Sequence, residues 1–369
     1  MLADLLYELH IYFSPLNVFK YITVRAALAG VTSLILSWYF GPKIIALMRR
    51  KQIGEIVRED APEGHHKKQG TPTMGGIIML LSVGSSLLMW AKLNNFYMIL
   101  AIVALYWMGI VGFVDDYLKN IKKKERGLIG RYKLVGQVLL GLIVGSAIYF
   151  HPELSLKGIN ANTSVPFFKN FEIELGLLYI PFVVFVITAT SNAVNLTDGL
   201  DGLAAGLLAI CSVVFAAIAY VTSNTVFSDY LNIIYLKGTA ELTIFSLAMF
   251  GASIGFLWFN AHPAEIFMGD VGSLSFGGAL GVLAVLLKKE LILPIIGGVF
   301  FIETLSVILQ VSYFKYTRRK YGTPRRIFKM TPLHHHFEKK GWHEAKIVTR
   351  FWIIGILLAL FTLTTFKIR

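Results

Sequence analysis

The stretch LNNFYMILAIVALYWMGIVGFVDDYLK, residues 93–119, decides the class of fold. Residues 93–114 carry no charged side chain, and two adjacent carboxylates, Asp115 and Asp116, follow at once. A helix of about 20 apolar residues crosses the ~30 Å hydrocarbon core of a bilayer. The stretch therefore predicts a membrane-spanning helix that ends in two acids at the membrane surface.

The same pattern recurs along the whole chain. The apolar cores are 26–42, 73–91, 93–114, 134–150, 175–197, 203–228, 242–264, 271–287, 291–314 and 351–366. Only 15% of the residues are charged and 55% are hydrophobic, whereas soluble domains have about 25% charged residues. This composition excludes a soluble or disordered chain. We therefore predict an all-α, polytopic integral membrane protein with about ten transmembrane helices in a single domain, residues 1–369.

The net charge of +13 raises the alternative of a nucleic-acid-binding protein. When the loops are numbered alternately, one set holds 24 Lys and Arg, the other set with both termini holds 10, and Lys43 lies at a helix end. Loops rich in Lys and Arg stay on the cytoplasmic side of a membrane. We therefore expect both termini to be extracytoplasmic, a large basic cytoplasmic loop at 315–350, a small hairpin or loop outside at 150–176, and no nucleic acid as a partner.

Polar residues interrupt the apolar sequence at five places, all on the basic side. The first is the pair Asp115 and Asp116. Neighbouring carboxylates repel each other, so they favour a divalent cation or a basic partner. An equally supported interpretation is that the two acids only balance the charge of the nearby lysines.

The second place is NLTDGLDG, residues 195–202, between two apolar cores. Asn195, Asp198 and Asp201 recur every third residue, so a helical turn would place their oxygens on one face. Capping of the next helix would explain one acid. It would not explain all three polar groups, and a binding site is favoured.

The third place is FNAHPAEIFMGDVGS, residues 259–273. Asp270 precedes an apolar helix, and an N-cap role would explain it alone. That role leaves Asn260, His262, Glu265 and the interfacial Phe267 unexplained. The segment therefore favours a functional loop.

The last two places are rich in histidine and basic residues. In TPLHHHFE, residues 331–338, three consecutive histidines cannot all face one direction, so a metal site made by them alone is not expected. The nearby basic residues favour contacts with phosphate instead. In HHKKQGTPTMGG, residues 65–76, glycines at a helix start would offer N–H groups to an anion. The favoured interpretation is a loop whose positive charge only sets the orientation of the chain in the membrane.

Together, the five places collect acids, histidines and lysines at one membrane face. The acids are Asp115, Asp116, Asp198, Asp201 and Asp270. Carboxylate and phosphate oxygens are the ligands that Mg²⁺ prefers. The sequence therefore favours phosphate chemistry on a lipid substrate.

These five segments, in this order, resemble the polyprenyl-phosphate N-acetylhexosamine-1-phosphate transferases, and within that superfamily the branch that transfers phospho-N-acetylmuramoyl-pentapeptide. The resemblance covers essentially the whole chain. The most specific segments are 70–76 and 332–338, followed by Lys340-Gly341-Trp342 and Arg350-Phe351-Trp352. It implies transfer from UDP-MurNAc-pentapeptide to undecaprenyl phosphate, giving lipid I and UMP with Mg²⁺, the first membrane step of peptidoglycan synthesis in the bacterial cytoplasmic (inner) membrane.

The resemblance also implies a role for each matching residue. Asp270 would be the main metal ligand, Asp115 would handle the attacking lipid phosphate, and Asp116 would support Asp115 or the metal. With His335 they form the expected catalytic set. The residues expected to bind the nucleotide sugar or its peptide are Lys68, Thr73, Asn195, Asp198, Asp201, Asn260, Phe267, His334 and His336.

Several alternatives stay open at this point. Direct attack by the lipid phosphate is favoured over a covalent aspartyl intermediate, because an ionised phosphate needs no activated nucleophile. A related transferase acting on UDP-GlcNAc would use the same acids, although the histidine segment argues against it. Glu303 inside the ninth core invites a cation-coupled transporter, but we expect it to point into the bundle and bond to a neighbour. A homodimer is usual among the proteins that the chain resembles.

Overall fold

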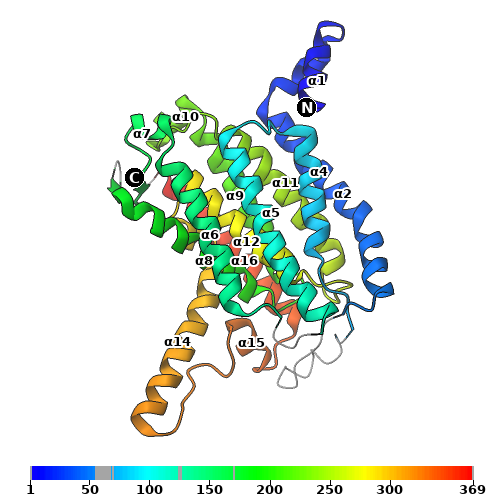
Figure 1. Ribbon diagram of the computed structural model, residues 1–369, viewed down its shortest axis with the longest axis vertical. Helices are drawn as coiled ribbons and strands as arrows, with labels where there is room; N and C mark the ends of the chain where they lie inside the picture. Colours follow the sequence, from blue (N-terminus) through cyan, green and yellow to red (C-terminus); the bar gives the residue numbers. More distant parts are fainter. Residues whose placement is uncertain (1, 55–67, 69, 124–126, 169–170, 368–369) are drawn as a thin grey trace.

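The computed structural model describes residues 2–54, 68, 70–123, 127–168 and 171–367, and this part of the chain is mainly helical (Figure 1). The long apolar helices are α2 (Ile22–Arg50), α4 (Gly76–Trp90), α5 (Phe96–Asp116), α6 (Gly130–Tyr149), α8 (Tyr179–Thr197), α9 (Leu203–Thr222), α11 (Ala240–Asn260), α12 (Gly269–Leu286), α14 (Gly298–Tyr321) and α16 (Glu344–Thr365). Nine of them are long and apolar enough to span a membrane within the described residues, and α4 is a shorter apolar helix. The prediction of an all-α polytopic membrane protein is confirmed.

Short elements connect these helices. The short helices are α1 (Leu2–Glu8), α7 (Pro152–Leu156), α10 (Thr225–Leu231), α13 (Leu293–Ile296) and α15 (Leu333–Glu338). There are also three 3₁₀ helices, η1 (Leu9–Ile11), η2 (Ser14–Lys20) and η4 (Gly176–Leu178), and a π-helix, η3 (Tyr117–Ile121). Strands β1 (Asn162–Ser164) and β2 (Glu172–Glu174) pair antiparallel. This hairpin lies within the segment 150–176.

The predicted boundaries differ from the structure mainly at the ninth apolar core. Residues 291–314 were expected to form one helix, but α13 ends at a Gly297–Gly298 break and α14 begins there. The helix α14 then continues to Tyr321, because basic residues in its last turn, among them Arg318 and Arg319, suit the negative end of a helix dipole. The first seven residues of the expected basic loop, 315–321, are therefore helical.

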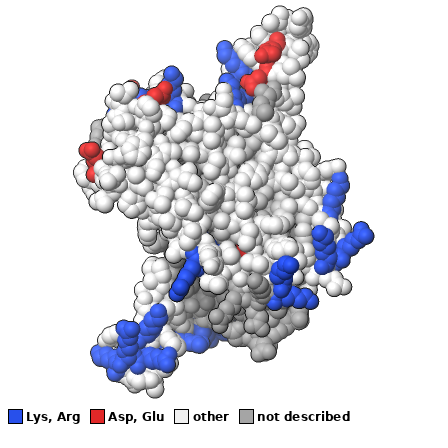
Figure 2. Space-filling view, in the orientation of Figure 1, with Lys and Arg blue, Asp and Glu red and all other residues white. Residues whose placement is uncertain are grey.

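The molecule has two ends that differ in character. Helices α1, α7 and α10 lie toward one end, and α15 with the protruding half of α14 lies toward the other (Figure 1). A broad band without charged side chains separates them on the face shown in Figure 2, and Lys and Arg gather toward the end at which α14 protrudes. Apolar side chains such as Ile308 and Leu357 are exposed on the long helices, as expected for surfaces that face lipid.

Helix α12 is the centre of the bundle, and nearly all of it is buried. Small residues let its neighbours approach closely. A Cβ atom on Gly76 of α4 would overlap the backbone of Gly272 in α12, and one on Gly112 of α5 would overlap the carbonyl oxygen of Asp270. This close packing brings the ends of α4, α5 and α12 together.

Buried charges away from the acidic motifs are paired inside the protein. At the start of α2, Arg25 donates to both carboxylate oxygens of Glu241, over 2.7 and 3.2 Å. Between α12 and α13, Glu290 accepts hydrogen bonds from Thr163 (2.7 Å) and Tyr179 (2.8 Å). The Arg25–Glu241 pair joins α2 to α11, and Glu290 joins the turn after α12 to β1 and α8.

Candidate active site

Three carboxylates that are distant in the sequence meet where α5 ends and α12 begins. Oxygen atoms of Asp115, Asp116 and Asp270 all lie within 4.8 Å of one another. Asp115 and Asp116 are buried in the last turn of α5, and Asp270 lies in the first turn of α12. Close packing of Gly112 against Asp270 fixes this arrangement. The structure thus brings together the three residues expected to act on the metal and the lipid phosphate.

Lys133, in the first turn of α6, lies among these acids. Its Nζ atom forms an ion pair with Asp115 Oδ2 at 3.0 Å and another with Asp270. Asp116 accepts the backbone N–H of Val271 at 3.1 Å, and Asp115 accepts that of Leu128 at 2.6 Å. From the sequence, Lys133 was expected only to contribute to the positive charge of a loop. The feature that could have indicated its role is its position directly before an apolar core, in the loop that follows Asp115 and Asp116.

Asn195 connects the second polar segment to the acids. Its Nδ2 atom donates to Asp270 Oδ1 and to Ser273 Oγ, both over 2.8 Å. Asp198 ends α8 only three residues later and is half-buried. The segment 195–202 and the start of α12 therefore belong to one site.

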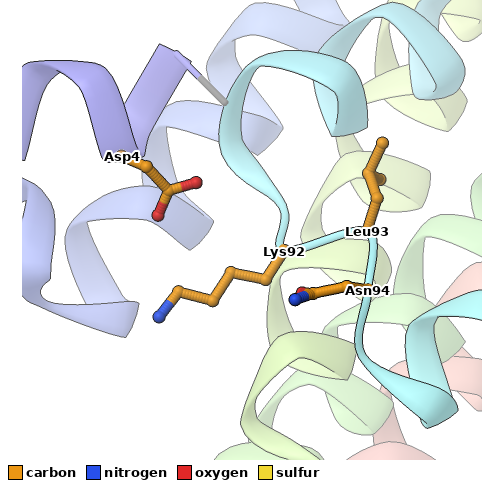
Figure 3. Close-up of a pocket in the computed structure, with 4 residues that line it drawn as sticks. All are labelled: Asp4, Lys92, Leu93 and Asn94. Atoms are coloured by element: carbon orange, nitrogen blue, oxygen red, sulfur yellow. The ribbon is translucent and has the colours of Figure 1, made fainter.

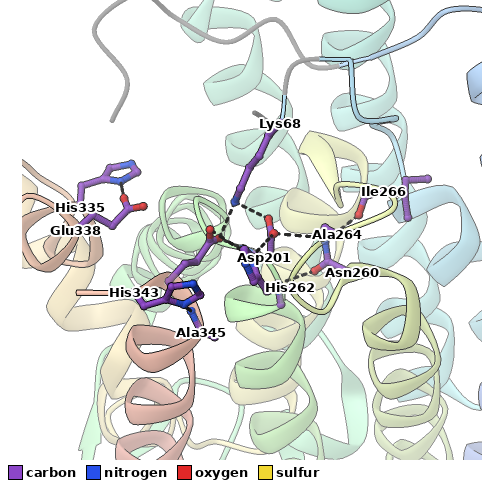
Figure 4. Close-up of polar contacts among 12 residues, drawn as sticks. Lys68, Asp201, Asn260, His262, Ala264, Ile266, His335, Glu338, His343 and Ala345 are labelled. Carbon is purple, nitrogen blue, oxygen red and sulfur yellow. Dashed lines mark hydrogen bonds and ion pairs between the residues drawn. The ribbon is translucent and has the colours of Figure 1, made fainter. Parts of the chain in front are cut away.

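Asp201 is the centre of a second polar cluster (Figure 4). Its Oδ1 atom accepts from Lys68 Nζ at 2.6 Å, and its Oδ2 atom lies 3.0 Å from His262 Nδ1 and accepts the Ala264 N–H at 3.2 Å. Glu344, at the start of α16, accepts from Lys68 over 2.6 Å. His262 and Glu344 were not among the predicted site residues.

Asn260 and Thr73 are buried between the loops that carry the site. Asn260 accepts the N–H of Gly202 at 3.0 Å and donates to the carbonyl of Ile266 at 2.8 Å, so its side chain joins the second and third polar segments. Thr73 is 1% exposed. The structure places both residues in the framework of the loops.

Phe267 lies between the two clusters along the chain. Its backbone N–H donates to the carbonyl of Pro72 at 2.8 Å, and the Nζ atom of Lys68 is 5.9 Å from the centre of its ring. Asp270 follows three residues later. The half-buried ring therefore lies near Lys68, three residues before Asp270 in the chain.

The three histidines point to three different partners, as their spacing predicts. His334 is fully buried, with Nδ1 3.3 Å from Glu303 Oε1, and its Nε2 lies against Gly199. His335 Nδ1 is 2.6 Å from Glu338 Oε2. His336 Nδ1 accepts the N–H of Lys329 at 3.0 Å, and partial burial followed by the charges of Lys340 and Lys329 lowers the pKa of His336.

Glu303 bonds to a neighbour inside the bundle, as expected. It accepts the backbone N–H groups of Leu333 (2.5 Å) and His334 (3.1 Å) at the start of α15. These two N–H groups have no partner within α15 itself. Glu303 thus holds the histidine segment against α14. This structural role explains the buried acid that had suggested a cation-coupled transporter.

The fifth polar segment is only partly described. Residues His65, His66, Lys67 and Gln69 lie outside the described residues. The N–H groups of Gly75 and Gly76 donate to the carbonyls of Phe267 (2.8 Å) and Met268 (2.9 Å). The reading of these N–H groups as an anion site is therefore wrong, because backbone carbonyls occupy them.

A separate hollow lies at the opposite end of the molecule. It has a volume of about 490 Å³ and is lined by Asp4, Lys92, Leu93 and Asn94 (Figure 3). Its walls belong to α1 and the turn after α4. None of the predicted site residues contributes to it.

The donor set at the ends of α5 and α12 suits a hard cation. Asp115, Asp116 and Asp270 offer carboxylate oxygens, which Mg²⁺ prefers over nitrogen or sulfur ligands. A second group, Asp201, His262 and Glu344, also lies within 4.8 Å. There the ammonium of Lys68 already compensates the two acids.

The bundle has carboxylates and lysines together at one end, and such groups bind hard cations and phosphate. Residues 97–288 match the model of a transferase family described as glycosyl transferase family 4, and these residues include α5, α8 and the start of α12. The chain is an enzyme of this class.

Similarity to individual proteins gives the particular family. The chain is 55% identical to the phospho-N-acetylmuramoyl-pentapeptide-transferase of Chloroherpeton thalassium, with 98% of each chain covered. It is 52% identical to the protein of the same name from Thermodesulfovibrio yellowstonii over the full length of both, and 48% identical to that from Flavobacterium psychrophilum with 97% of each covered. The chain belongs to the phospho-N-acetylmuramoyl-pentapeptide-transferase family.

Proposed function

We propose that this enzyme transfers phospho-MurNAc-pentapeptide from UDP-MurNAc-pentapeptide to undecaprenyl phosphate, giving lipid I and UMP. The family membership supports the substrates. The single observation that carries the chemistry is the meeting of Asp115, Asp116 and Asp270 within 4.8 Å at the end of a membrane bundle. A lipid phosphate and a water-soluble nucleotide sugar can meet only at such an interface.

Mg²⁺ is the proposed cofactor, and Asp270, Asp115 and Asp116 are its proposed ligands. When bound, the ion would neutralise the diphosphate and the UMP that leaves. The oxygen donors of the three acids support this assignment. Asn195 orients Asp270 through its 2.8 Å hydrogen bond, in the way that outer partners commonly orient metal ligands.

The reaction joins an oxygen of the lipid phosphate to the β-phosphorus of the nucleotide sugar, and the bond from that phosphorus to the oxygen of UMP breaks. The lipid phosphate is already ionised, so no residue has to remove a proton from it. Asp115 and Lys133, paired at 3.0 Å, are proposed to position the incoming phosphate. Direct attack is the proposed course.

The nucleotide sugar is proposed to bind over the loops between the two clusters. Phe267 would stack on uracil, and Lys68 would contact the diphosphate. His335, 16% exposed, would contact a phosphate or the sugar-peptide together with His336, and the fully buried His334 would shape the site from behind them. The remaining residues proposed to line or shape this site are Thr73, Asn195, Asp198, Asp201 and Asn260.

The site is proposed to face the cytoplasm of a bacterial cell, in the inner membrane, with both termini outside. The excess of Lys and Arg in one set of loops supports this orientation. The uncharged band in Figure 2 supports a position across the bilayer. A homodimer is part of the proposal, on the resemblance alone.

The decisive test is Mg²⁺-dependent release of UMP by the purified chain in detergent with undecaprenyl phosphate. We expect release with UDP-MurNAc-pentapeptide and none after chelation of divalent cations. UDP-GlcNAc serves as the competing substrate. Turnover of UDP-GlcNAc alone would contradict the proposed substrate.

A further inference from the structure

Glu344 joins three separate segments of the site although no sequence motif singled it out. It is the first residue of α16, and its side chain is 11% exposed. Its Oε1 atom accepts the backbone N–H of Asp201 at 2.7 Å and the Nζ of Lys68 at 2.6 Å. Its Oε2 atom lies 3.5 Å from His262 Nδ1. One carboxylate thus connects α16 with the loops that carry Lys68, Asp201 and His262.

Lys68 depends on Glu344 for its orientation. A lysine has a long, flexible stem, and here two carboxylates hold its ammonium at 2.6 Å each. The Asp201 carboxylate also binds the Ala264 N–H and His262, so it is fixed to the loop between α11 and α12. Glu344 supplies the second charge-assisted bond, and two such bonds define the direction of the lysine.

The ammonium held in this way lies beside the proposed nucleotide site. Lys68 Nζ is 5.9 Å from the centre of the Phe267 ring, and Asp270 follows Phe267 by three residues. An ammonium here is within reach of a diphosphate that joins a stacked uracil to a sugar near the acids. Its orientation before binding therefore affects how well the nucleotide sugar is bound.

The alternative role for this cluster is a second metal site, because Asp201, His262 and Glu344 offer donors within 4.8 Å. Two carboxylates here share the ammonium of Lys68, whereas three carboxylates surround the ammonium of Lys133 at the ends of α5 and α12. The cluster is therefore better explained as a support for the lysine.

We propose that Glu344 is a positioning residue, which holds Lys68 in the conformation that receives the UDP-sugar and itself contacts no substrate. This inference rests on the proposed function. It differs from the family-implied roles because Glu344 acts through Lys68. Its loss should weaken binding of the nucleotide sugar and leave the chemical step nearly unchanged.

The test is a double-mutant cycle on Glu344 and Lys68, with KM for UDP-MurNAc-pentapeptide and kcat measured for each variant. Glu344→Ala should raise KM about tenfold, as expected for the loss of a hydrogen bond to a charged group. Glu344→Gln should raise it less, because its amide oxygen can still accept from Lys68. In the Lys68→Ala background, Glu344→Ala should change KM by less than about twofold.

The matched control is Glu153→Ala, the same change in the first turn of the remote helix α7, where Glu153 is exposed. It should leave KM unchanged. The inference would be overturned by a lower kcat at constant KM, or by the same rise in KM with and without Lys68. Melting temperatures identify misfolded protein, and Glu344→Gln keeps the test available if Glu344→Ala unfolds.

Calorimetric binding of UDP-MurNAc-pentapeptide separates this inference from the proposed function. A wild-type chain that binds the nucleotide sugar without releasing UMP would contradict the proposed function alone. Weaker binding by Glu344→Ala, lost in the Lys68→Ala background, would still support the role of Glu344. Equal binding by the wild type and Glu344→Ala would overturn it.

Discussion

Asn195 Nδ2 donates a 2.8 Å hydrogen bond to Asp270 Oδ1 across 75 positions of the chain. This bond fixes the end of α8 against the start of α12. It unites two polar segments that capping alone could have explained separately. The acids of α5 complete the group from a third direction, and the chemistry of the enzyme is expected at this junction.

Removal of one charge from the acidic group should nearly abolish turnover. We expect Asp115→Asn and Asp270→Asn each to lower the rate of UMP release by about 10²-fold or more, because both would act on the reacting phosphates. His335→Ala should have an effect of similar order. Asp229→Asn, a change at an exposed acid of α10, is the control and should be neutral. Near-normal rates in all three site variants would remove the site assignment.

Glu303 should stabilise the histidine segment. Glu303→Ala leaves the N–H groups of Leu333 and His334 without their acceptor. The expected loss in free energy of unfolding is about 2 kcal/mol, measured by denaturation in detergent, with reduced UMP release. Glu303→Gln should lose less. Ile308→Ala, at an exposed position of the same helix, is the control, and equal stability of Glu303→Ala and this control would contradict the role.

Gly112 should tolerate no side chain. A Cβ atom there would overlap the carbonyl oxygen of Asp270, so Gly112→Ala must separate α5 from α12. We expect a loss of about 1–3 kcal/mol in unfolding free energy and a large loss of UMP release. Gly130→Ala places its methyl group in open space and is the control. A fully active Gly112→Ala would show that the three acids need no close contact.

Lys288 should make stability depend on pH on the alkaline side. Burial lowers the pKa of Lys288 from 10.5 to about 8. Between these values the unfolded chain binds a proton that the folded protein does not, so stability rises as pH increases from about 8 to 10.5. The expected gain is of order 1–3 kcal/mol.

The measurement compares melting temperatures at pH 7 and pH 9.5 for the wild type and Lys288→Met. The variant should lose this rise, because it has no proton to release. Lys157→Met, a change at an exposed lysine, should behave as the wild type does. A wild-type melting temperature that falls over this pH range as steeply as that of Lys288→Met would contradict the prediction.

The spans were predictable because each depends on local composition. A run of apolar residues is read directly from the sequence, and α5 and α12 begin and end close to the predicted positions. The break at Gly297 and the extension of α14 to Tyr321 were missed. Hydropathy shows where the apolar run ends and charged residues begin. A helix can continue past that point as a basic, water-exposed segment, so its true end is not seen.

The sequence identified the acids of the site, but it did not identify the side chains that pair with them. Asp115, Asp270 and Asn195 stand out because polar groups beside apolar runs are costly. Lys133 and Glu344 do not stand out, because a lysine in a basic loop and an acid in a first helical turn have ordinary explanations. Only the packing of α6 and α16 against the other segments gives them partners.

The two lysines inside the carboxylate clusters have a consequence for how the protein is made. Lys133 and Lys68 carry, within the chain itself, positive charge that offsets their acidic neighbours. A newly inserted chain can therefore bring those acids together during assembly without first capturing an ion from the cell. We therefore expect scarcity of the proposed cation to slow the enzyme without lowering the amount of folded protein.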